Sequence, residues 1–551
     1  MNVIMRKKWV AAAAAVQVVS LLAMTGCASN NNDGQSEPAG QGAAAESKDN
    51  INKTGFPIAN EPVQLKGLVS KYELVKDWNE HKGMKHYEEL SNVMIEWDSV
   101  PQNSFEERRN LLFASNDLPD FVMRANLSSQ LLTSYAATGQ IIALDELIEA
   151  GYAPNLSALM EEDEGIRKAI TAADGHIYSL PNISEADGRI SSSWINQKWL
   201  EKLGLEMPST MDEFYEVLKA FKEKDPNGNQ QADEVPFTGY KETKSSGNEL
   251  IRTFYGSWGY GGNSGIIAPY MDVDGEGKIR YIATDDTFKE IIVFFNKLWT
   301  EGLIDKEIFS QDMNKVVSKV DEDRVGFVAR GNNNLWLGNN RANYVQNPVL
   351  RATDGDIYWV GVNPKVREVG SFVITNKNPN PEATLRWADH FLSEEGTALA
   401  RLGIKDVTYT IDADGFYKLK DEFANNPNGL TVDEALSEYT IFQGGQITQR
   451  VTQKVDQSAA VLPEMIANKD IIRPYLVPDE KLMNPSFTEE ENIKLGTIAT
   501  DLEAYTDEQV VKFVTGSRPI GEWDKFVSTL NNMKLDEYLA IYQAAYDRWN
   551  Q

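Results

Sequence analysis

Apolar positions recur along the chain with two different periods, and the two periods alternate. Short apolar runs bounded by turn residues predict strands, and apolar residues three and four positions apart predict helices. One clear helical stripe consists of Phe214, Val217, Leu218 and Phe221. The predicted strands cover residues 92–100, 118–122, 176–181, 190–195 and 371–375. The predicted helices cover residues 104–115, 143–150, 155–173, 197–203, 210–221, 284–298, 382–392 and the stretch from about 489 onward. This alternation predicts an α/β fold with a mostly parallel sheet.

Short polar signals mark helix starts and one hairpin. A Ser or Thr followed three residues later by Glu is a capping box, and proline favours the first turn of a helix. Residues 274–277 contain two glycines between two strand-like runs and therefore predict a hairpin. The predicted helix starts are the pairs Ser104 with Glu107 and Thr210 with Glu213, and the single residues Thr284 and Pro381.

The N-terminus predicts export and a lipid anchor. Three basic residues at positions 6–8 precede an alanine-rich apolar run over residues 9–24. This run is too short and too interrupted for a membrane-spanning helix, but it suits a signal peptide. Small residues then lead to a cysteine in a pattern that resembles a bacterial lipobox, which implies cleavage after Gly26 and a lipid on Cys27. The alternative is an ordinary signal peptide that happens to end near a cysteine.

The residues after the leader predict a tether followed by a large folded body. Residues 27–52 are rich in Asn, Gly, Ser, Gln, Ala and Glu, and they contain too little apolar surface to fold. As a flexible coil of about 25 residues, this segment spans roughly 25–30 Å. The remaining roughly 500 residues are enough for two or three domains. Because Cys27 is the single cysteine, the exported fold contains no internal disulfide.

The net charge of the chain limits the classes of partner that it can bind. The formal net charge is −28, and loss of a leader with three basic and no acidic residues brings the mature chain to −31. A strongly negative surface argues against nucleic acid and against adhesion to anionic lipid headgroups. The net charge does not exclude a local ligand site, because a few basic residues can override the negative electrostatic field nearby.

Residues 225–234 carry the strongest chemical signal. Oxygen-bearing side chains stand at alternate positions, as at the start of a calcium-binding loop. The EF-hand pattern then fails, because Gln230 replaces the usual glycine and Pro236 the usual final glutamate. The predicted ligands of a structural Ca²⁺ ion are Asp225, Asn227, Asn229, Gln231, Asp233 and Glu234, with the Gln231 carbonyl in the main-chain position. The alternative is a solvated turn rich in Asn and Asp that follows a helix.

Five segments, taken in order, resemble a known family. They cover residues 115–120, 174–181, 194–205, 225–234 and 513–523. Together they resemble the extracellular solute-binding proteins of ABC importers, in the large lipoprotein subgroup that includes alginate-oligosaccharide binders. This resemblance implies a two-lobed periplasmic-binding-protein-like fold with crossover strands and a helical C-terminus. It also implies calcium in the 225–234 loop, a sugar between the lobes, and an ABC permease with its ATPase as partners.

The resemblance also suggests how the chain divides. We expect a signal peptide over residues 1–26 and a tether over 27–52. We expect one lobe to combine residues 53–189 and 371–440, and the other to combine 190–370 and 441–551. The expected product is a monomer, anchored by lipid to the extracytoplasmic face of the cell membrane.

Candidate sugar contacts come from aromatic and amide side chains, because rings stack on sugar faces and amides bind hydroxyls. Trp336 follows an asparagine run that ends at Asn334, and Trp258 lies in a glycine-rich stretch. The other candidates follow predicted strands or lie near a predicted crossover, and for each an ordinary loop or core role is the alternative. They are Asn196, Asp120, Phe442 and Gln443.

Two rival functions share much of this pattern. A lipid-anchored carbohydrate-active enzyme requires a pair of catalytic carboxylates, but with 82 acidic residues such pairs carry no weight. No Gly-x-Ser-x-Gly motif or phosphate-binding loop is present. A peptide-binding lipoprotein has the same fold, and the sequence separates it poorly from a sugar-binding one.

Overall fold

The computed structural model describes residues 50–75, 77–186, 190–240, 249–262, 268–331, 334–442, 445–456, 470–482 and 484–551. The leader, Cys27 and most of the expected tether lie outside these ranges. The folded body includes Asn50, whose side chain exchanges two hydrogen bonds with the main chain of Glu61. Order therefore begins before residue 53, where we had placed the boundary. Within the described ranges, no helix is both long and apolar enough to cross a membrane.

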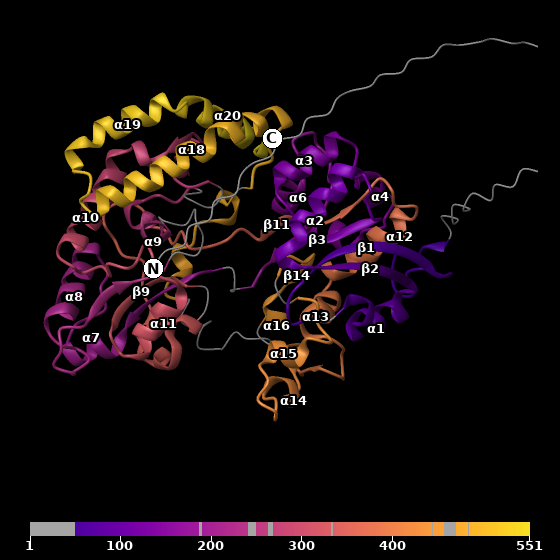
Figure 1. Ribbon diagram of the computed structural model, residues 1–551, viewed down its shortest axis with the longest axis horizontal. Helices are drawn as coiled ribbons and strands as arrows, with labels where there is room; N and C mark the ends of the chain where they lie inside the picture. Colours follow the sequence, from indigo (N-terminus) through magenta and orange to yellow (C-terminus); the bar gives the residue numbers. More distant parts are fainter. Residues whose placement is uncertain are drawn as a thin grey trace, which may run out of the picture. The chain divides into compact units, whose positions relative to one another are not determined.

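The first sheet has six strands in the order β14-β4-β11-β3-β1-β2 (Figure 1). β1 pairs in parallel with β2 and β3, and β14 pairs in parallel with β4. β11 is antiparallel to both of its neighbours, so the expectation of a mostly parallel sheet holds only in part. The strands are β1 (Val63–Lys71), β2 (Val93–Pro101), β3 (Phe121–Leu127), β4 (Leu180–Ser184), β11 (Val366–Ile374) and β14 (Gln449–Val451).

An aromatic cluster forms the centre of the core around this sheet. Phe121 lies between Phe372, at 5.1 Å, and Trp97, at 5.5 Å between ring centroids. Trp387 packs against both Trp97 and Phe121. The helices that belong with this sheet are α1 (Lys82–Ser91), α2 (Gln102–Ser115), α3 (Ser129–Ala137), α4 (Asp145–Glu149), α5 (Pro154–Glu162), α6 (Glu164–Ile170), α12 (Pro381–Asp389), α13 (Glu394–Leu402), α14 (Asp421–Ala424), α15 (Val432–Leu436) and α16 (Gln453–Asp456).

The second sheet has four strands in the order β10-β5-β9-β6. β5 is antiparallel to β10 and β9, whereas β6 and β9 are parallel. The strands are β5 (Ser192–Asn196), β6 (Val235–Thr238), β9 (Val325–Gly331) and β10 (Tyr344–Gln346). The associated helices are α7 (Gln197–Leu203), α8 (Met211–Glu223), α9 (Glu249–Arg252), α10 (Asp286–Thr300), α11 (Met313–Asp321), α18 (Glu489–Val514), α19 (Trp523–Asn532) and α20 (Leu535–Trp549). The C-terminal helices close one large core together with α8 and α10.

The chain passes between the two sheets three times: after β4, before β11, and after β14. The strand pairing moves two of the boundaries that we expected. β11 already pairs with β4 from Val366, five residues before the expected boundary at 371. Gln449–Val451 pairs with β4 as well, so β14 lies in the first sheet although we had placed residues 441–551 in the other lobe.

Most predicted elements are present, with two errors in their caps. Thr210 and Glu213 form the expected capping box of α8, and α12 begins at Pro381. The hairpin at 274–277 joins β7 (Met271–Val273) to β8 (Ile279–Tyr281), and a second hairpin pairs β12 (Tyr409–Ile411) with β13 (Tyr417–Leu419). The cap predictions at Ser104 and Thr284 are wrong. Both hydroxyls donate to a carbonyl three residues earlier, on Pro101 and Tyr281, instead of accepting from a helix amide.

Candidate functional site

The loop at 225–234 connects α8 to β6 and folds around the carboxylate of Asp225. Its Oδ1 accepts hydrogen bonds from the amides of Gly228 (2.8 Å) and Asn229 (3.1 Å), and its Oδ2 accepts one from Gln230 (3.1 Å). Asp225 and Gln230 have positive φ, which turns the chain sharply twice within six residues. The first predicted ligand therefore organises the turn of the loop.

Three further predicted ligands converge within this loop. The side-chain amides of Asn227 and Asn229 both donate to Oδ1 of Asp233, at 3.3 and 2.9 Å. The other oxygen of Asp233 lies 3.2 Å from Nε of Arg324, the residue directly before strand β9. The side chain of Gln231 is exposed, as expected for a residue that offers its main-chain carbonyl.

Glu234 ends the loop and is the last of the predicted ligands. Its Oε1 is buried and has no hydrogen-bond partner. Burial raises the pKa of Glu234, and the nearby carboxylates of Asp233 and Asp225 raise it further. An unpaired, buried carboxylate oxygen beside two other carboxylates fits Ca²⁺, which prefers hard oxygen ligands. Among the described residues, no group of three or more His, Cys, Asp or Glu side chains is placed to hold a metal ion, and this includes the three carboxylates of the loop.

The described sugar-contact candidates occupy separate places. Asn196 is fully buried, where Oδ1 accepts from the Trp199 amide and Nδ2 donates to the Val325 carbonyl. This side chain caps α7 and anchors β9. Asp120 stands at the amino end of β3, where its Oδ2 accepts from the Lys66 amide at 2.7 Å.

The aromatic candidates pack within their own parts of the protein. Trp258 ends the short 3₁₀ helix η4 (Tyr255–Trp258) and lies edge-on to Phe294, with 5.7 Å between ring centroids. Phe442 lies under the guanidinium of Arg401 at 4.0 Å. Asn334 and Trp336 begin the 3₁₀ helix η6 (Asn334–Asn343), but their side chains lie outside what the structure describes, as does all of Gln443.

A buried polar row in the first sheet was missed by sequence reasoning. The row crosses four adjacent strands and consists of Gln449, Asn182, Glu368 and Arg124. Gln449 donates to Asn182 Oδ1 at 3.2 Å, and Asn182 donates to Glu368 Oε2 at 2.9 Å. The guanidinium of Arg124 is fully buried without a hydrogen-bond partner, and burial lowers its pKa to about 10. The signal was an arginine inside the apolar run of β3.

The row lies close to the point where the chain leaves the first sheet. Glu185 directly follows β4 and holds Arg450 of β14 through two contacts, at 3.0 and 3.2 Å. In open α/β sheets, ligands bind beyond the carboxyl ends of the parallel strands. Here those ends are at Lys71, Pro101 and Leu127, whereas Asp120 stands at the opposite, amino end of β3.

Comparison with known proteins identifies the family. The sequence profile described as bacterial extracellular solute-binding protein matches residues 69–398. The chain belongs to this family. It is 32% identical over 511 residues to the fructooligosaccharide ABC transporter substrate-binding protein FusA of Streptococcus pneumoniae serotype 4, covering 90% of this chain and 92% of FusA. It is 25% identical over 462 residues to lipoprotein LipO of Bacillus subtilis, covering 80% of each chain.

Solved structures of related solute-binding proteins share the fold. FusA in complex with kestose has a TM-score of 0.68 at 29% identity, covering 88% of this chain and 99% of FusA. The alginate-binding protein AlgQ2, solved without calcium ion, has a TM-score of 0.67 at 26% identity, covering 89% and 99%. The two-lobed α/β solute-binding fold is therefore confirmed. The family consists of binding proteins of transporters, so this extracellular solute-binding protein is not an enzyme.

Proposed function

We propose that this solute-binding protein captures a neutral oligosaccharide of the fructooligosaccharide class and delivers it to an ABC permease. The observation that carries the proposal is the similarity to FusA, which extends over 90% of the chain at 32% identity. FusA has been solved with kestose and, as an EF-hand mutant, with fructo-nystose. A match across both lobes supports a shared class of ligand better than a match to one lobe, because both lobes contact the solute in this architecture.

Net charge favours a neutral sugar over an acidic one. The Bacillus subtilis polygalacturonan/rhamnogalacturonan-binding protein YtcQ is 25% identical but matches only 47% of this chain. The net charge of −28 repels a polyanion over long distances at low ionic strength. A neutral fructan experiences no such repulsion.

Calorimetry and thermal shift test this proposal directly. Kestose and nystose are expected to bind and to raise the melting temperature, because they bind only the folded state. Oligogalacturonate, alginate oligosaccharides and a set of short peptides serve as competing classes. Binding of a peptide or an acidic oligosaccharide, without any response to kestose or nystose, would contradict the proposal.

We also propose that the 225–234 loop holds a structural Ca²⁺ ion. The support is the unpartnered Glu234 oxygen and the convergence of Asn227 and Asn229 on Asp233. Related proteins add to it, since FusA has been solved as an EF-hand mutant and AlgQ2 without calcium ion. Residues Asp225, Asn227, Asn229, Asp233 and Glu234 would supply side-chain oxygens. Equilibrium dialysis against ⁴⁵Ca²⁺ is expected to give one bound ion per chain, and no retained calcium at millimolar concentration would refute the site.

Lipid anchoring through Cys27 completes the proposed function. The lipobox-like sequence and the similarity to lipoprotein LipO support it. A flexible tether would hold the protein near its permease at the outer face of the membrane. Replacement of Cys27 by Ser is expected to release the protein into the medium, and retention on the membrane would show that another contact anchors it.

A further inference from the structure

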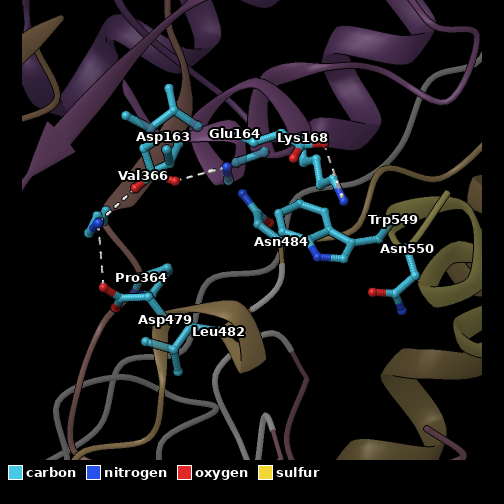
Figure 2. Close-up of a pocket in the computed structure, with 14 residues that line it drawn as sticks. Asp163, Glu164, Lys168, Pro364, Val366, Asp479, Leu482, Asn484, Trp549 and Asn550 are labelled. Atoms are coloured by element: carbon cyan, nitrogen blue, oxygen red, sulfur yellow. Dashed lines mark hydrogen bonds and ion pairs between the residues drawn. The ribbon is translucent and has the colours of Figure 1, made fainter. Parts of the chain in front are cut away.

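A cavity of about 440 Å³ lies where four distant chain segments meet (Figure 2). Its walls come from α6 and its N-cap, from residues 364–366 at the start of β11, and from a third and a fourth group of residues. These groups are Asp479, Leu482 and Asn484, and, at the C-terminus, Trp549 and Asn550. Two of these segments belong to the second and third passages of the chain between the sheets. Anything bound here would touch the first sheet at Val366 and two of the connections between the sheets.

Apolar side chains form part of the lining of this cavity, although polar atoms contribute more of its exposed surface. Ile166, Val366 and Leu482 are buried with 3% or less of their surface exposed. Trp549 is partly buried against the core of the first sheet. Its indole faces the space between α6 and residues 479–482 in Figure 2. A flat aromatic wall over an apolar floor suits the CH faces of a hydroxylated ring.

The charged residues at the rim are paired with one another. Nζ of Lys365 lies 2.7 Å from Asp163 Oδ2 and 3.6 Å from Asp479 Oδ2, and it thereby joins α6 to the segment 479–484. Lys168 lies 3.7 Å from Glu164 on the same helix. The rim therefore holds three carboxylates and two lysines, and the one negative charge in excess disfavours an anionic ligand.

Two amides offer the remaining polar contacts. The side chain of Asn484 faces the indole of Trp549 in Figure 2, and it makes no hydrogen bond to any residue that the structure describes. Asn550 donates through Nδ2 to the Tyr546 carbonyl at 3.0 Å, which leaves its Oδ1 available. Asn484 can therefore donate and accept a hydrogen bond, and Asn550 can accept one. Neutral hydroxyl groups can pair with both kinds of partner.

We propose that this cavity is a second ligand site, which takes a neutral hydroxylated ring molecule of mono- or disaccharide size. This inference goes beyond the transported solute. The carboxyl ends of β1, β2 and β3, where the solute is expected, contribute no lining residue. Two segments that connect the sheets form its walls, so a ligand in the cavity will change the affinity for the transported sugar. By thermodynamic linkage, the transported sugar changes the affinity for the cavity ligand by the same factor.

Saturation-transfer NMR tests the second site with fructose, glucose and sucrose as probes. We expect at least one probe to bind at millimolar concentration and to keep its signal when kestose saturates the protein. Ala169→Phe places an aromatic ring into the cavity and is expected to lower the affinity for that probe at least fivefold. Asn484→Ala removes a polar contact and keeps the space, and a two- to fivefold loss is expected. Val293→Phe, which adds the same ring at an exposed position of α10, serves as the matched control and leaves probe binding unchanged.

Three results would overturn the second site. None of the probes binds, or kestose displaces every probe, or Ala169→Phe and Asn484→Ala bind the probe as well as the Val293→Phe control does. Calorimetry with kestose on the same variants keeps the two proposals apart. Kestose binding without a second probe site refutes this inference alone, and a probe site without kestose binding refutes the proposed function alone.

Discussion

The 225–234 loop and the polar row in the first sheet are built in opposite ways. All predicted calcium ligands fall within ten consecutive residues, and hydrogen bonds inside the loop hold several of their side chains in place. The polar row draws Arg124, Asn182, Glu368 and Gln449 from four strands that are far apart in sequence. A local site can be recognised from spacing, whereas a site assembled by strand order is invisible until the sheet is formed. The following variants sharpen this contrast, from the largest expected effect to the smallest.

A substitution in the 225–234 loop is expected to have the largest effect on the free energy of unfolding. Asp225→Ala removes the carboxylate that accepts from three loop amides and would ligate the ion. At calcium concentrations of roughly 100 times Kd, the ion adds about 2.7 kcal/mol to the free energy of unfolding, and the variant loses this contribution. Denaturant titrations with calcium and with EDTA measure it.

Asp414→Ala is the matched control, because Asp414 is an exposed aspartate in the turn of another hairpin. Calcium should stabilise this control as much as the unmodified protein. If calcium stabilises Asp225→Ala equally well, the loop is a solvated turn and the contrast with the polar row disappears.

Trp336→Ala tests a predicted sugar contact that lies outside both regions. We expect a tenfold or greater loss of oligosaccharide affinity, about 1.4 kcal/mol, because an indole stacks on a sugar face. Trp258→Ala is the comparison variant. Trp258 packs on Phe294 and lines a separate hollow beside α8 and α10, so a loss of less than twofold is expected. Calorimetry that shows equal affinities for both variants, with intact folds, would remove Trp336 from the site.

The pH dependence of the calcium-free protein should report on Glu234. Burial and the carboxylates of Asp233 and Asp225 raise the pKa of Glu234 in the folded state. The protonated Glu234 carboxyl therefore contributes to the free energy of unfolding. This contribution is fully present below the pKa of Glu234 in the unfolded chain and is lost as the pH rises through its pKa in the folded protein. In EDTA, the melting temperature should fall more from about pH 4.5 to about pH 6 than it does in Glu234→Gln.

Calcium should reverse the sign of this difference, because protons compete with the metal for the same carboxylate. In calcium, the unmodified protein should gain stability relative to Glu234→Gln as the pH rises. A difference between the two proteins that stays constant with pH in both buffers would show that Glu234 does not titrate with folding.

The smallest effect is expected at the connection between the sheets. Lys365→Met breaks the contacts to Asp163 and Asp479, which are partly exposed. Such ion pairs contribute about 0.2–1 kcal/mol. Lys198→Met, which breaks a 3.0 Å pair with Asp323 away from these connections, is the control. Urea titrations should give similar small losses, and a loss above about 2 kcal/mol for Lys365→Met would show a larger structural role than surface pairing explains.

Sequence reasoning worked best where one element carries its own signal. The capping box at Thr210 and Glu213, the proline at 381 and the apolar stripe of α8 all predicted what the structure shows. It failed at Ser104 and Thr284, because a hydroxyl near a helix start can accept from an amide or donate to a carbonyl. It also assigned residues 449–451 to the other lobe, because a three-residue strand has no periodicity that indicates its partner.

By itself, the sequence determined the elements, the calcium-type loop and the family resemblance, since each of these depends on neighbours along the chain. The tertiary structure alone decided the strand order β14-β4-β11-β3-β1-β2, the burial of Arg124 and the cavity beside Trp549. These features require contacts between residues separated by much of the chain. The free energy that selects such contacts comes from burying surface against a distant partner, and local spacing does not reveal which partner that is.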